Sequence, residues 1–176
     1  MISSKILDIL FKTYSFSKIK NIVVSSSQFT KTDYLSAAMA RENDMKHLRN
    51  NPNCIVFSIY CAGVAIECML RAYISRHSSE YSSRHDLIKL LIESNLASLL
   101  TIREREQITV DIKEAVKIWN NNLRYTSELR IKRILMHEIA QQQYQPKNIN
   151  KYLLKFKSEI FNITENFLKL AKSKWT

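Results

Sequence analysis

Residues 53–76 read NCIVFSIYCAGVAIECMLRAYISR, and this is the most apolar stretch of the chain. Apolar side chains fall nearly all around a helical wheel of the segment, which predicts a buried central helix. Asn51 and Pro52 stand directly before it, and asparagine as a cap followed by proline at the first helical position is a helix start signal. Gly63, the only glycine, lies in mid-segment, where glycine costs about 1 kcal/mol relative to alanine. We therefore expect another helix to approach closely at Ala62 and Gly63.

The rest of the composition also favours helices. The chain has 176 residues with one glycine and two prolines, whereas the turns of sandwiches and barrels depend on both residue types. This length suits one domain that buries a core without disulfides or metals. We predict an all-α protein: an up-and-down bundle of four to six helices over residues 30–176, and an N-terminal arm (residues 1–29) with a short amphipathic helix. Besides the central helix, hydrophobic periodicity predicts helices at about 30–48, 85–94, 104–122, 127–142 and 148–173.

The charge balance is strongly basic, because 27 Lys and Arg against 16 Asp and Glu give a net charge of +11. Such an excess indicates an anionic partner, which would be a nucleic acid, an acidic protein or a membrane surface. A solvated surface without a partner is the alternative, since charge excess alone is weak evidence of binding.

We expect a cytoplasmic protein with no membrane span and no metal site. Lys5 and Asp8 interrupt the short apolar run near the N-terminus, and no stretch approaches about 18 uncharged apolar residues. Cys54, Cys61 and Cys68 are seven residues apart, which on a helix separates neighbouring sulfurs by about 10 Å, too far for one zinc ion. Small core residues in a reducing compartment fit these cysteines better.

Glu67 and Arg71 are the unusual pair in the central helix. They are four residues apart, so they share one helix face. A buried carboxylate is costly unless it is paired or hydrogen-bonded. The pair is therefore either a structural ion pair that locks helix packing or the lining of a polar pocket.

The segment WNNNLRY (residues 119–125) closes a predicted helix with an aromatic residue, three amides, an arginine and a tyrosine. Trp119 is expected in the core. Arg124 offers a planar fork for phosphate and Tyr125 a ring face for stacking on bases. Alternatively, Arg124 pairs with Glu67 or caps a helix end.

Three of these segments resemble the HEPN domain family. They are AGVAIECMLRAYI, RHDLIKLL and IWNNNLRYTSELR, and the likeness extends over roughly residues 34–170. HEPN proteins are small prokaryotic helical bundles of toxin–antitoxin, abortive-infection and CRISPR-linked systems. The resemblance implies a bundle of four or five helices that is often a dimer.

Many HEPN members are metal-independent ribonucleases, in which an Arg and a His on a late helix, with four to six residues between them, meet across a dimer interface. The ribose 2′-OH attacks the adjacent phosphate, histidine moves protons and arginine stabilises the phosphate charge. Of the pairs with fitting spacing, only Arg130 and His137 fall on a late helix. The family's usual form continues with x-Tyr after the His, whereas this chain has Glu138-Ile139. The other two pairs are Arg41 with His47 and Arg71 with His77.

The resemblance therefore predicts a basic HEPN-like module, without a cofactor, that binds RNA or a protein partner such as a nucleotidyltransferase or a larger effector. Its expected binding residues include Arg124 and Tyr125 on the surface. Glu67, Arg71 and His85 complete the expected set, with His85 alternatively a plain contact between loop and helix. The other prediction is a metal-independent endoribonuclease toxin that uses Arg130 and His137 across a homodimer interface.

Overall fold

The computed structural model describes residues 29–78, 85–141 and 148–175. These residues form six α-helices and two short 3-10 helices, and no strand occurs among them, so the all-α prediction is confirmed. The arm predicted at residues 1–29 lies outside the described residues except for Phe29. The α-helices are α3 (Lys31–His47), α4 (Ile55–Ile74), α5 (Leu87–Glu93), α6 (Ile102–Ile118), α7 (Glu128–Gln141) and α8 (Ile149–Ser173), and the 3-10 helices are η1 (Leu96–Leu99) and η2 (Asn121–Tyr125).

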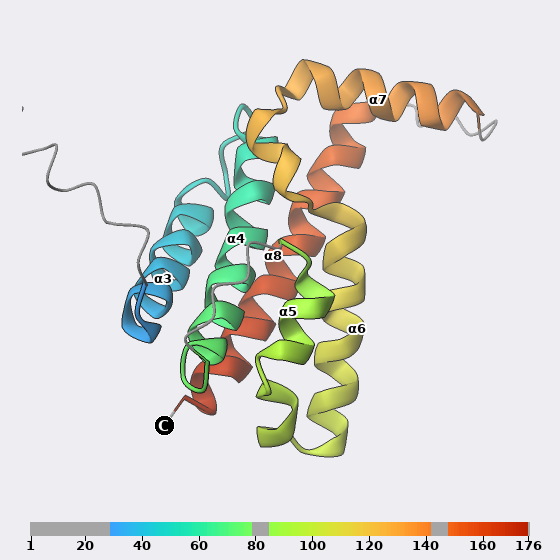
Figure 1. Ribbon diagram of the computed structural model, residues 1–176. Coiled ribbons are helices and arrows are strands. Elements are labelled where there is room, and N and C mark those ends of the chain that lie inside the picture. Colours follow the sequence, from blue (N-terminus) through green and yellow to red (C-terminus); the bar gives the residue numbers. More distant parts are fainter. Residues whose placement is uncertain (1–28, 79–84, 142–147, 176) are drawn as a thin grey trace, which may run out of the picture.

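The helices form a bundle around α4, as predicted (Figure 1). Helix α3 covers one side of α4, α8 packs along another, and α5 and α6 close the opposite side. Helices α4 and α8 run in one direction, while α3 and α6 run in the other. Helix α7 departs from the up-and-down pattern because it crosses the end of the bundle and projects beyond it (Figure 1).

Helix α4 is buried along nearly its whole length, as its apolar sequence predicts. By length and composition it is the one helix in the described part of the chain that could cross a membrane. However, 78% of its most apolar window is buried inside the bundle, which is what a central core helix shows.

The start of α4 differs from the Asn51-Pro52 signal. The helix begins at Ile55, and its N-cap residue Cys54 makes no side-chain cap bond. Asn51 instead closes a local turn, because its side chain accepts a hydrogen bond from the Asn53 amide at 2.9 Å. The Ile55 amide, which has no partner within α4, donates to the Glu128 carboxylate at 2.6 Å, so the first turn of α7 caps α4 from a distance.

The close approach predicted at Gly63 exists, but an indole makes it. Trp119 lies against Gly63 so tightly that an alanine Cβ there would fall 2.2 Å from Trp119 Cγ. Trp119 Nε1 also donates to the Tyr60 carbonyl at 3.1 Å. Trp119 is the C-cap residue of α6, so this contact fixes the end of α6 against the middle of α4.

Two predicted boundaries also shift. The helix predicted at 104–122 starts at Ile102, behind a Thr101–Glu104 capping box, and residues 121–125 form η2 instead of its last turn. Asp86 is the N-cap of α5 and not part of its first turn, since its side chain accepts hydrogen bonds from the Ile88 and Lys89 amides.

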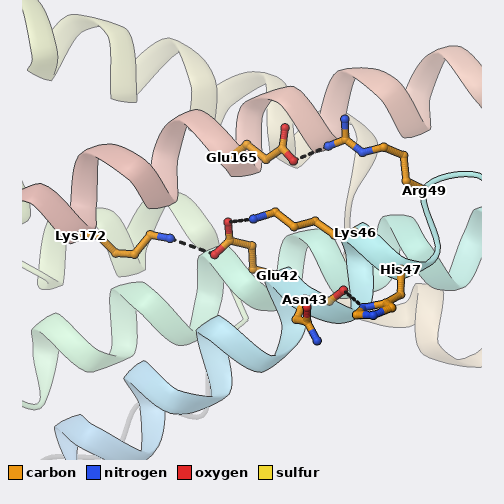
Figure 2. Close-up of polar contacts among 7 residues, drawn as sticks. All are labelled: Glu42, Asn43, Lys46, His47, Arg49, Glu165 and Lys172. Carbon is orange, nitrogen blue, oxygen red and sulfur yellow. Dashed lines mark hydrogen bonds and ion pairs between the residues drawn. The ribbon is translucent and has the colours of Figure 1, made fainter.

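Charged side chains fasten α3 to α8 (Figure 2). The Glu42 carboxylate, only 7% exposed, accepts hydrogen bonds from Lys46 at 2.7 Å and from Lys172 of α8 at 3.0 Å. Arg49, just past α3, pairs with Glu165 of α8. Burial opposes ionisation of Glu42, but the two lysines outweigh it and hold the pKa of its carboxyl below the ordinary value of 4.5.

Glu42→Gln is expected to lower the free energy of unfolding by about 1 kcal/mol at neutral pH, since both lysine partners are half exposed and screened. A carboxyl whose folded pKa is depressed stabilises the fold above its unfolded pKa and loses that effect as the pH falls through the folded pKa. In urea titrations over a pH series, the difference between wild type and variant should therefore shrink as the pH falls below about 4.5 and vanish only below the folded-state pKa of Glu42. The control Glu159→Gln, in an exposed pair, should show no such pH-dependent difference.

Candidate functional site

Glu67 is the centre of a polar cluster inside the apolar helix α4. Its side chain is 9% exposed and that of Arg71 is 6% exposed, and Arg71 Nε donates to Glu67 Oε1 at 2.8 Å. His85 Nδ1 lies 3.0 Å from both carboxylate oxygens. Asp86 is the N-cap of α5, and the residue before it, His85, faces α4. The predicted residues Glu67, Arg71 and His85 thus form one hydrogen-bonded cluster, with His85 as its solvent-facing member at 39% exposure.

Tyr60 and Cys68 lie beside this cluster in neutral form. Burial and, as a smaller effect, the Glu67 charge raise the pKa of the Cys68 thiol to about 11. Burial also raises the pKa of Tyr60, where the Arg124 charge acts to lower it and Glu67 to raise it. Both groups therefore offer donors and no anionic nucleophile at neutral pH.

The cysteines do not form a metal site. Cys61 is fully buried, as expected of a core residue, whereas Cys54 and Cys68 are half-buried. In the part of the chain that the structure describes, no three His, Cys, Asp or Glu side chains gather as metal ligands would.

The three segments that carry the family resemblance meet around the middle of α4. The first contains Gly63 and Glu67, the second supplies His85, and the third supplies Trp119, which packs on Gly63. Arg124 of the third segment lies close enough to Tyr60 to act on its pKa. The predicted positions are thus joined by contacts between segments that lie far apart in sequence. Hydrophobic periodicity alone does not predict such contacts.

Arg124 and Tyr125 occupy the surface at the end of η2. The Arg124 guanidinium lies 4.4 Å from the centroid of the Tyr125 ring, and Tyr125 is 70% exposed. Glu67 bonds to Arg71 and His85, so the alternative pairing of Arg124 with Glu67 does not occur. Among the described residues, no ion pair involves Arg124, which leaves its charge available to an anion.

Helix α7 carries an exposed cationic stripe, defined by Arg130, Arg133 and His137. With about 100° per residue, positions seven apart differ by about 20° in direction, so Arg130 and His137 lie on one face with Arg133 between them. Among the side chains that the structure describes, which leave out those of residues 138–141, no acidic one pairs with any of the three. Glu128, the acidic residue in the first turn of α7, instead accepts a hydrogen bond from the Ile55 amide.

The other two Arg–His pairs with ribonuclease-like spacing serve structural contacts. His47 donates to the Asn43 carbonyl at 2.8 Å (Figure 2), and Arg41 pairs with Asp44 at 3.0 Å. His77 Nε2 lies 3.1 Å from the Glu93 carbonyl, while Arg71, the arginine of that pair, is buried in its ion pair with Glu67. Arg130 and His137 remain the pair open to a ligand.

A pocket of about 470 Å³ lies between α7 and the bundle, and no feature of the sequence predicts it. Its apolar walls come from α4, η2, α7 and α8, and its polar lining includes Arg130 and the amide of Asn120. Hydrophobic periodicity along one helix does not predict a pocket of this kind, because the pocket arises where a helix crosses the end of the bundle. Six apolar wall residues are Val56, Ile59, Leu123, Ile131, Leu153 and Phe156.

Tyr60, whose pKa responds to the charges of Glu67 and Arg124, is a neighbour of the site that sequence reasoning did not single out. It lies seven residues before Glu67, which is two helical turns, and that spacing was the available signal.

The chain was compared with models of protein families, with curated proteins and with solved structures, and it matches none of them.

Proposed function

We propose that the chain is a HEPN-like basic module of a bacterial defence or toxin–antitoxin-type system that binds RNA. The cationic stripe on α7, together with Arg124 and Tyr125, forms the contact surface. The observation that carries the proposal is that these cations are exposed and have no acidic partner among the described residues. Exposed Leu129 and Met136 on α7 additionally offer apolar contacts to a protein partner such as a nucleotidyltransferase or a larger effector.

The geometry suits single-stranded RNA. Guanidinium groups bind phosphate oxygens through paired hydrogen bonds, and the stripe presents two of them along one line. Tyr125 exposes a ring face to which a base can stack, backed by the Arg124 guanidinium. Since these contacts address phosphate and base faces, binding should be sensitive to salt and tolerant of sequence.

Arg133→Gln is expected to weaken binding of a single-stranded RNA and to reduce the slope of log K against log salt by about 0.7, the value for one phosphate contact. Fluorescence anisotropy across a salt series in EDTA measures both quantities. Lys113→Gln on α6 makes the same change in net charge away from the stripe and should leave the slope unchanged. Equal slopes for both variants and wild type would contradict the proposal.

A second candidate is a metal-independent endoribonuclease, and the shared face of Arg130 and His137 favours it. These side chains are exposed on a helix that projects from the bundle end, where a second copy could meet them (Figure 1). Cleavage of RNA in EDTA that is lost in both Arg130→Ala and His137→Ala, but kept in Arg133→Ala, would support the nuclease. RNA binding by wild type without cleavage would support the binding module alone.

A further inference from the structure

The pocket beneath α7 shares Arg130 with the stripe, but its other lining residues have no part in the proposed RNA binding. Protein interiors are packed so closely that voids larger than a water molecule are few. A space of about 470 Å³ falls within the range of small-ligand sites. Glu128 fastens the start of α7 to α4 through the Ile55 amide, and Val56, the next residue of α4, lines the pocket.

Lys117, Asn120 and Arg130 bring N–H donors to the pocket, beside Asn122, Thr126 and Tyr152, whose side chains can donate or accept. Asn120 uses its side-chain oxygen to cap η2, which leaves its NH₂ group for a ligand. Tyr152 also lines the pocket and makes an aromatic contact with Phe156, with ring centroids 4.6 Å apart. A donor-rich lining selects a ligand that supplies acceptors.

The charge of the lining limits the ligand to one anionic group. Lys117 also lines the pocket, but it is paired with Glu114 at 2.6 Å, and the two side chains are 65% and 49% exposed. Arg130 is the lining cation without an acidic partner among the described residues. The planar fork of a guanidinium matches a carboxylate through two parallel hydrogen bonds.

We propose that this pocket binds a hydrophobic monocarboxylate, with its apolar body between α7 and the bundle and its carboxylate on Arg130. Apolar walls such as Ile59, Ile131 and Phe156 take the body, and burying it stabilises the complex in proportion to the apolar area removed from water. Nothing in this proposal depends on RNA binding, and the two are tested separately.

The test is a titration of the full chain with octanoate, followed by ¹H–¹⁵N spectra. Resonances of pocket residues such as Ile59, Leu123 and Tyr152 should shift at millimolar octanoate or below. Octan-1-ol, which has the same chain and no charge, should bind at least about tenfold more weakly. Unmoved pocket resonances, or equal affinity for octanoate and octan-1-ol, would overturn the proposal.

Matched variants on α7 locate the site. Arg130→Gln should weaken octanoate binding about tenfold and leave octan-1-ol unchanged, whereas Arg133→Gln should do neither. Ile134→Trp fills the pocket from its rim and should abolish binding of both probes. Leu129→Trp is the control, because Leu129 is 67% exposed and does not line the pocket. Retained binding in Ile134→Trp, or ligand-free shifts that depend on protein concentration, would overturn the proposal, the latter in favour of a second copy in the pocket.

Discussion

Gly63→Ala is expected to lower the free energy of unfolding by about 3 kcal/mol, at the upper end for one added methyl group in a packed core. The added Cβ would lie 2.2 Å from Trp119 Cγ and 2.3 Å from two further indole atoms, so the indole or the helix must move. Trp119 is 2% exposed and its Nε1 is bound to the Tyr60 carbonyl, so it has little freedom to retreat. The gain of about 1 kcal/mol in helix propensity offsets only part of this cost. Urea denaturation measures the difference.

A double-mutant cycle separates steric overlap from other effects of the substitution. Trp119→Ala alone should cost about 3–5 kcal/mol, as for other large-to-small substitutions of a buried tryptophan. In that background, Gly63→Ala should become stabilising by up to about 1 kcal/mol, because only the helix propensity remains. If Gly63→Ala destabilises the protein equally in both backgrounds, the contact with Trp119 is not the reason for the glycine.

This contact shows how far sequence reasoning reaches. A glycine in the most apolar helix predicts that something approaches closely, since its propensity cost needs compensation. The residue that approaches lies 56 positions later, at the C-cap of α6. Apolar periodicity places Trp119 in the core but gives no partner for it, because a pattern within one helix carries no information on contacts between helices.

The ends of the helices show the same limit. The Thr30 capping box starts α3, at the residue that the cap preference of threonine indicates. The α4 start signal at Asn51-Pro52 instead formed a local turn, and the cap of α4 came from Glu128 on α7. A cap supplied by a residue next to the helix can be predicted from the sequence. A cap supplied by another helix is a tertiary contact and cannot.

The candidate site also has parts that the sequence predicts and parts that depend on tertiary contacts. The Glu67–Arg71 pair follows from a spacing of four residues on a helix and is predictable. That His85 joins the pair depends on how the α5 cap packs against α4. The stripe on α7 could be read from spacing, but its freedom from acidic partners and the pocket behind it depend on where α7 crosses the bundle.

Glu67→Leu is expected to lower the free energy of unfolding by about 3–5 kcal/mol, because it removes the carboxylate that faces the buried Arg71 guanidinium. Glu106→Leu, at an exposed position of α6, is the matched control and should change stability by no more than about 0.5 kcal/mol. Urea denaturation of both variants tests this. A cost below about 1 kcal/mol for Glu67→Leu would mean that water reaches the carboxylate, and the buried cluster would be wrong.

The double variant Glu67→Leu with Arg71→Met decides between the two roles of the cluster. Replacing a buried ion pair by apolar residues of similar volume is often neutral or stabilising, so the double variant should recover most of the stability lost by Glu67→Leu. If the cluster only locks helix packing, the recovered protein should bind RNA with wild-type affinity and salt slope. If it recovers its stability but loses RNA affinity, Glu67 and Arg71 serve the ligand through His85, the exposed member of the cluster. The order of these two measurements matters, because a loss of binding is informative only in a variant that is folded.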